Sequence, residues 1–171
     1  MHDPAAMAPN APPGPGPKER EPLTESVTHI VEEARMLIPG VTAFLGFQLV
    51  AVFSTAFSQK LTRDEQLLHV LAMFLTLVAL LMLLTPAAYH RQAESGWVSE
   101  GFVNLSSRFI TGATPLFALG ITGDFYLLVR AVTENTILAA ITAILVLTIA
   151  VVLWYGVPHV RVLERVLRGD R

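Results

Sequence analysis

The chain contains no cysteine and few charged residues, and both shortages narrow what it can be. Without cysteine, disulfide bonds, thiolate zinc sites and cysteine nucleophiles are excluded. Asp, Glu, Lys and Arg make up only 15% of the 171 residues, whereas a soluble domain has about 25%. The net charge is −2 and nothing resembles the basic footprint of a nucleic-acid-binding surface, so no nucleic-acid partner is expected.

The few charges are distributed so that four long stretches have almost none. Residues 36–59, 66–90 and 135–160 contain no Asp, Glu, Lys or Arg, and residues 109–129 contain only Asp124. A membrane-spanning helix needs about 20 mostly apolar residues, because the hydrocarbon layer is about 30 Å thick. We therefore predict an all-α membrane protein with four transmembrane helices, for which the lipid bilayer is itself a partner.

Four buried helices of a soluble protein would be the alternative. Such helices usually keep a polar stripe that faces solvent. Residues 72–84 and 137–154 have no such stripe, so the membrane interpretation is preferred.

The boundaries follow from the apolar runs and the signals beside them. We predict a four-helix transmembrane domain over residues 37–160, with spans at about 37–57, 67–89, 109–129 and 136–157. Thr62 and Glu65 have the spacing of a capping box, so the second helix should begin in water. The longest loop is expected at residues 91–107.

Different structure is predicted outside the spans. Residues 1–22 hold seven of the eleven prolines, a composition typical of a disordered tail. Residues 23–36 place apolar and charged side chains on opposite faces, which predicts a short amphipathic juxtamembrane helix. This helix either lies on the membrane surface or extends the first span into water. Residues 161–171 form a basic tail.

Positive charge is unevenly divided between the two ends of the predicted bundle. Four spans put both termini on one side, which carries nine of the twelve Lys and Arg residues. The opposite side carries Lys60, Arg63 and Arg130. Because positively charged loops tend to stay inside the cell, we predict that both termini are cytoplasmic.

Asp124 is the only acidic residue inside a predicted span, and an ionisable group in a membrane suggests a functional site by default. It lies sixteen residues after Arg108, or about 24 Å along the helix, which places it near the outer interface. Arg130 or water could satisfy it there. We therefore interpret Asp124 as an interfacial acid rather than a proton carrier, which would need partner groups.

Gln48 and two histidines are the other polar groups of interest. Gln48 is predicted to bond to a neighbouring span, for example to Thr76 or Thr142. His69 and His90 lie at opposite ends of the second span, so they cannot share one metal, and His90 is interpreted as a headgroup-level residue. No catalytic, cofactor-binding or metal-ligating residue is predicted, and no cofactor.

Small residues on the third span predict a close helix contact. Gly112, Gly120 and Gly123 fall near one face, and small residues let helices approach closely in lipid. Ala139 and Ala143 on the fourth span are candidates to face this glycine seam.

Three segments resemble a family of small bacterial membrane proteins that is known only as a domain of unknown function. They are residues 38–41 (IPGV) with Gln48 downstream, 84–91 (LTPAAYHR) and 104–112 (NLSSRFITG). The resemblance covers about residues 25–161, and LTPAAYHR contains its most specific part. It implies four helices in a bacterial inner membrane, and it supplies no catalytic or binding residues.

The sequence leaves two functional hypotheses open. No GxSxG, HExxH, P-loop or paired-carboxylate pattern is present, so an enzyme is not expected. The first hypothesis is a non-enzymatic structural or accessory subunit, either a homo-oligomer or bound to another membrane protein. The second is a small transporter or channel component that uses Asp124 and Gln48. A polar cavity reaching Gln48 would favour transport, and a sealed apolar bundle would favour the accessory role.

Overall fold

The computed structural model describes residues 23–93 and 99–157, and every regular element in these ranges is helical. In chain order the helices are α1 (Leu23–Val52), α2 (Thr55–Lys60), α3 (Arg63–Ala93), α4 (Glu100–Thr133), α5 (Thr136–Val151) and a π-helical turn, η1 (Val152–Gly156). The helices α1, α3, α4 and the continuous α5–η1 segment are long and apolar enough to cross a membrane. The predicted all-α fold with four spans is confirmed.

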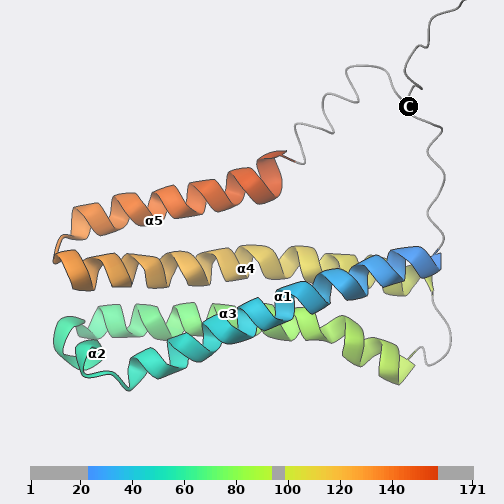
Figure 1. The fold of residues 1–171 in the computed structure, drawn as a ribbon, viewed down its shortest axis with the longest axis horizontal. Helices are drawn as coiled ribbons and strands as arrows, with labels where there is room; N and C mark the ends of the chain where they lie inside the picture. Colours follow the sequence, from blue (N-terminus) through green and yellow to red (C-terminus); the bar gives the residue numbers. More distant parts are fainter. Residues whose placement is uncertain (1–22, 94–98, 158–171) are drawn as a thin grey trace, which may run out of the picture.

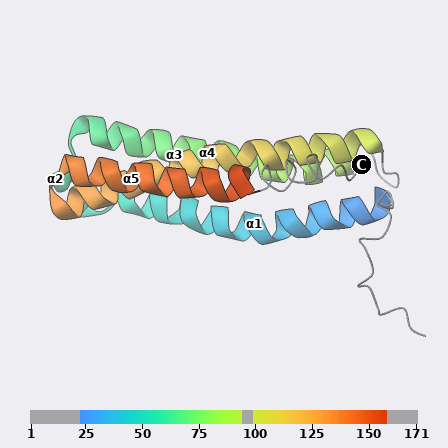
Figure 2. The ribbon, with the colours of Figure 1, turned by 90° about the horizontal axis from the view of Figure 1, so that it is seen from above.

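The four long helices form an elongated bundle in which consecutive helices run in opposite directions (Figure 1). Helices α3 and α4 lie side by side, α5 flanks α4, and α1 crosses α3 at an angle. The view from above shows the same elongated arrangement (Figure 2). The short α2 lies at the end where α1 leads into α3 and α4 leads into α5, which we call the α2 end.

Side-chain caps fix where the helices begin. The predicted capping box is present at the start of α3, where the Thr62 backbone N–H donates to Glu65 Oε2 at 2.8 Å and the Glu65 N–H donates to Thr62 Oγ1 at 3.3 Å. Asn135 Oδ1 accepts from the first N–H groups of α5 at 3.0 and 3.1 Å. These acceptors satisfy N–H groups that have no partner within their own helix.

Two predicted boundaries were wrong. The first span was predicted to reach Phe57, but α1 ends at Val52, and Ser54 Oγ caps the separate helix α2 by accepting from the Phe57 N–H at 3.3 Å. Residues 91–107 were predicted as a loop, but α4 already begins at Glu100, with Ser99 as its cap. Each boundary depends on a serine whose side chain accepts a backbone hydrogen bond, a role that a search for apolar runs does not detect.

The predicted amphipathic helix at residues 23–36 and the first span form one continuous helix, α1. This agrees with the alternative in which the segment extends the span. Pro39 lies inside α1 and removes one backbone donor without ending the helix. The predicted tails at residues 1–22 and 161–171 lie outside the described residues.

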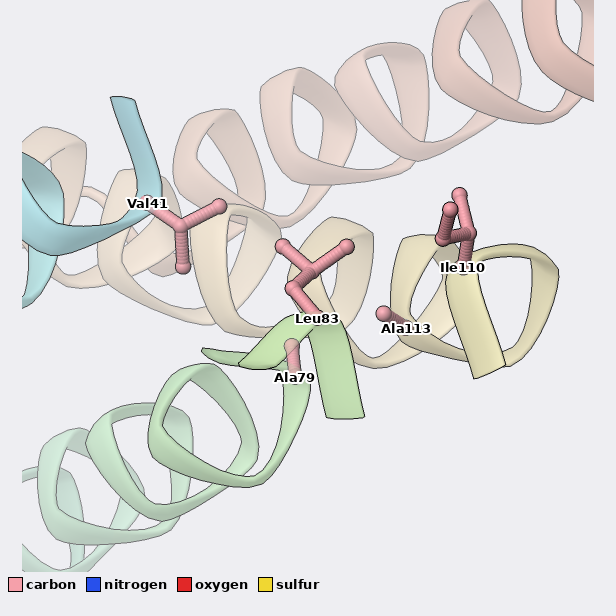
Figure 3. Packing of buried hydrophobic residues seen from close by; sticks show 5 residues of the cluster. All are labelled: Val41, Ala79, Leu83, Ile110 and Ala113. Carbon is pink, nitrogen blue, oxygen red and sulfur yellow. The ribbon is translucent and has the colours of Figure 1, made fainter. Parts of the chain in front are cut away.

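The apolar core lies where α1, α3 and α4 meet (Figure 3). Its buried members are small or branched, and they are Val41, Ala79, Leu83, Ile110 and Ala113. On the outside of the bundle, large apolar side chains are exposed along all four long helices. This distribution is the one a lipid-facing surface requires, since lipid solvates apolar side chains.

The glycine seam of α4 lies against α3. A Cβ added at Gly120 would lie 2.5 Å from Thr76 Oγ1 and 3.0 Å from the Ala72 carbonyl oxygen. Ala139 and Ala143 of α5 are buried, but the atoms nearest to the seam glycines belong to α3. The predicted seam is therefore present with a different partner helix, because the absence of side chains lets α3 and α4 approach closely.

Candidate functional site

A cluster of three polar side chains joins three helices near the α2 end. Asp124 of α4 receives a hydrogen bond from Gln48 Nε2 of α1 at 2.7 Å, and its other oxygen lies 2.8 Å from His69 Nδ1 of α3. His69 Nε2 lies 3.0 Å from the Gln48 carbonyl oxygen. The residue exposures are 2% for Gln48 and 5% for His69, and the Asp124 side chain is 16% exposed. We call these three residues the polar cluster.

The geometry of the polar cluster fixes its proton content. A carbonyl oxygen only accepts, so His69 Nε2 carries a hydrogen and donates it to the Gln48 carbonyl. One further proton must then lie between His69 Nδ1 and Asp124, because two lone pairs at 2.8 Å would repel each other. The two residues together therefore share one exchangeable proton, and with it their combined charge is zero.

An open pocket of about 360 Å³ lies beside the polar cluster. This volume is at the small end of the range for small-molecule sites, about 300–1,000 Å³. All three residues of the polar cluster line it, and the rest of the lining is mostly apolar. Its aromatic members are Phe44, Phe47, Phe57 and Phe125. An apolar cavity with a few convergent polar groups is typical of a ligand site.

One polar atom beside this pocket is left without a protein partner. Gln48 Oε1 is buried and accepts no hydrogen bond from the described residues. The orientation of the amide is determined by Asp124, because a carboxylate requires the amide nitrogen on its side. Leaving a buried acceptor unpaired costs about 1–3 kcal/mol. The bond from Gln48 to Asp124 is therefore made at a cost to the other end of the same amide.

The α2 segment closes the pocket at the end of the bundle, and polar contacts hold it there. Gln66 Nε2 of α3 donates to the Leu61 and Phe57 carbonyl oxygens at 3.2 and 3.4 Å. Lys60 Nζ reaches the Ala131 carbonyl oxygen of α4 at 3.5 Å. These contacts connect α2 to both α3 and α4, so the pocket wall is tied to the bundle.

The structure brings together two of the three predicted polar residues. Asp124 and Gln48 bond to each other, whereas His90 lies toward the other end of α3, with its ring centroid 5.3 Å from that of Phe102. The prediction that Gln48 bonds to another span is confirmed, but its partner is Asp124 rather than Thr76 or Thr142. Arg130 as the partner of Asp124 was wrong. Arg130 pairs with Glu65 at 3.3 Å rather than with Asp124.

The threonines proposed as partners of Gln48 are also engaged elsewhere. Thr76 donates to the Ala72 carbonyl oxygen at 3.0 Å, and Thr142 donates to the carbonyl oxygens of Leu138 and Ala139. Both hydroxyls bond back to their own helix, as threonines in helices often do.

His69 is the member of the polar cluster that the sequence interpretation missed. It was considered only as a metal ligand together with His90. A usable signal was present, because Gln48, His69 and Asp124 all lie within about three helical turns of the α2 end. In a bundle of antiparallel neighbours, residues at the same depth can meet. Within residues 23–93 and 99–157, no group of three or more His, Asp or Glu side chains is arranged to hold a metal ion.

The fold and this site define a multi-pass helical membrane protein with a polar cluster beside an aromatic pocket. The chain belongs to a family of unknown function, DUF6328, whose model matches residues 18–158. This agrees with the resemblance seen in the sequence. No curated protein and no solved structure matches the chain.

Proposed function

We propose that the protein is the ligand-binding component of a small-molecule transport system, and that it binds an amphipathic molecule in the aromatic pocket. One observation carries this proposal: the polar residues Gln48, His69 and Asp124 converge on a pocket of about 360 Å³ whose other walls are mostly apolar. The ligand would place a hydrogen-bond donor against the Asp124 carboxylate and an apolar body among the phenylalanine rings. This role is non-enzymatic, because binding and release need no reacting group.

The pocket bears on the two hypotheses raised by the sequence. It reaches Gln48, as expected for transport, but its lining is mostly apolar rather than polar. An accessory subunit needs only a well-packed bundle, in which polar side chains satisfy each other. Here the polar cluster joins three helices and all three of its residues also line a pocket. That arrangement supports binding of a ligand, and we place the accessory role second.

We further propose that the protein lies in the inner membrane with both termini in the cytoplasm. Nine Lys and Arg residues lie on the side of the two termini and three lie on the opposite side, and this difference supports the orientation. The α2 end, with the pocket, would then face the outside. A topology reporter fused after Arg171 should be active only in its cytoplasmic form, and one inserted near Gln59 only in its exported form. The reverse pattern of reporter activity would show that the proposed orientation is inverted.

Ligand binding in the pocket is tested by a substitution that fills the pocket. Ala51 lines the pocket from α1, so Ala51→Phe should reduce the affinity for phenylpropanol by about tenfold or more, because the new ring occupies the ligand's space. Phenylpropanol is chosen because it joins one hydroxyl donor to one aromatic body. Binding would be measured by isothermal titration calorimetry on the full chain in lipid nanodiscs.

Ala43→Phe is the matched control for this measurement. It makes the same change on the same helix at an exposed position outside the pocket lining, and it should change the affinity by less than about twofold. If the parent protein does not bind phenylpropanol, or if both variants weaken binding equally, the pocket is not the binding site.

A further inference from the structure

We propose that the pocket selects a monovalent organic cation with an apolar body, and that this cation enters in exchange for the proton shared by His69 and Asp124. The inference rests on the proposed function, since it names the ligand class of the same pocket. It follows from the charge that the polar cluster carries with and without its proton.

The charged side chains near the α2 end, outside the polar cluster, are either engaged with other groups or lie away from the pocket. On α3 and α4, Glu65 and Arg130 pair with each other at 3.3 Å. On α2, Lys60 contacts the Ala131 carbonyl oxygen at 3.5 Å. The contribution of α1 is the neutral Gln48, and residues 136–151 of α5 contain no titratable side chain. Arg63, Asp64 and Glu134 also lie near the α2 end, but none of them lines the pocket. Among the lining residues the titratable side chains are His69 and Asp124, so a charge change at the pocket falls on these two.

The exchange conserves both protons and charge. Before binding, His69 and Asp124 hold one proton between them and have no net charge. When that proton leaves to water, neutral His69 keeps its hydrogen on Nε2 and continues to donate to the Gln48 carbonyl. The Asp124 carboxylate must then move away from His69 Nδ1, because the two lone pairs that shared the proton now repel each other. Asp124 is then an unneutralised carboxylate beside the pocket. One incoming cation restores electrical neutrality, and one proton is released.

The lining of the pocket is suited to such a cation. Aromatic ring faces attract positive charge, and four phenylalanines line the pocket. Asp124 supplies the opposite charge and can accept a hydrogen bond from an ammonium group. An anion would face this carboxylate, so it would be repelled. A neutral alcohol could donate a hydrogen bond to the carboxylate but would not neutralise its charge.

Three probes with one shared apolar body test this proposal on the full-length parent protein in nanodiscs: phenylpropylamine, phenylpropanol and phenylpropionate. The amine should bind about tenfold or more tightly than the alcohol at pH 8, and the carboxylate should bind more weakly than either. The affinity for the amine should rise as the pH is raised, because each bound amine replaces one proton of the polar cluster while the amine itself stays protonated. Titrations in buffers of different ionisation enthalpy should show about one proton released per amine bound, and none per alcohol.

A matched pair of variants connects the effect to Asp124. Asp124→Asn should abolish the preference for the amine over the alcohol and the release of a proton. Asp64→Asn makes the same chemical change at an exposed position in the first turn of α3, near the same end of the bundle, and it should retain both properties. Equal loss in the two variants would overturn the assignment to Asp124.

The outcomes separate this inference from the function it rests on. If the alcohol binds but the amine is not preferred, or if amine binding releases no proton, the cation exchange is overturned while the proposed function stands. If none of the three probes binds the parent protein, the proposed function fails and the inference fails with it.

Discussion

Replacing Gly120 by leucine is expected to destabilise the folded bundle by about 3 kcal/mol, the upper part of the range for overpacking. A Cβ at this position would lie 3.0 Å from the Ala72 carbonyl oxygen and 2.5 Å from Thr76 Oγ1. The first of these atoms is backbone and the second is on a fully buried side chain, so neither can move aside easily. The substitution must therefore push α3 and α4 apart along the main contact of the bundle.

Two other glycines provide graded controls for this prediction. At Gly112 the nearest atom to an added Cβ is the flexible end of Met82, at 2.7 Å, so Gly112→Leu should cost less, about 1–2 kcal/mol. At Gly46 nothing lies within 4 Å, so Gly46→Leu should be nearly neutral. Equilibrium unfolding in bicelles would give the three values. Equal costs at all three positions would show that the close approach of α3 and α4 does not limit side-chain size.

Asp124→Ala is the second substitution with a large expected effect, a loss of about 2–3 kcal/mol in the free energy of unfolding. It removes the acceptor of Gln48 Nε2 and the partner of His69 Nδ1, both on buried residues. Each donor would then be left in a poorly solvated environment, where an unpaired polar group is unfavourable.

A double-mutant cycle with His69→Phe measures this coupling directly. Once His69 is absent, removal of Asp124 should cost at least about 1 kcal/mol less than it does in the parent protein. The reason is that the variant has no His69 ring nitrogen left to lose its hydrogen-bond partner. The four proteins of the cycle would be unfolded under identical conditions in bicelles. Strict additivity of the two single substitutions would show that His69 and Asp124 do not interact, and would remove the basis for a shared proton.

This expectation reverses the one that depth along the helix suggested. From its distance to Arg108, Asp124 was predicted to be an interfacial acid that Arg130 or water satisfies. The structure directs it inward instead, onto His69 and Gln48, while Arg130 is paired with Glu65. Depth along one helix is determined by residue count, but the direction in which a side chain points also depends on how that helix is rotated in the bundle.

Much of the fold was determined by local properties of the sequence. Apolar runs longer than about 20 residues require helices, because lipid cannot satisfy backbone hydrogen bonds. That requirement predicted the four spans, and the Thr62–Glu65 spacing predicted the cap of α3. Gly120 was predicted to be at a helix contact because only small residues permit close approach. All of these inferences depend on neighbours along the chain or on one helix.

Only the tertiary structure decided which residues meet across helices. The sequence does not show that α3 rather than α5 packs on Gly120. It puts His69 and Asp124 at a similar depth, but it does not show that their side chains point toward each other. In lipid, apolar contact gives helices little preference for one partner, so the rotation of each helix depends on the whole set of polar contacts and close approaches. The pocket exists for the same reason, since its walls come from four separate helices. Its size and its polar lining residues depend on how these helices pack together, which no single segment determines.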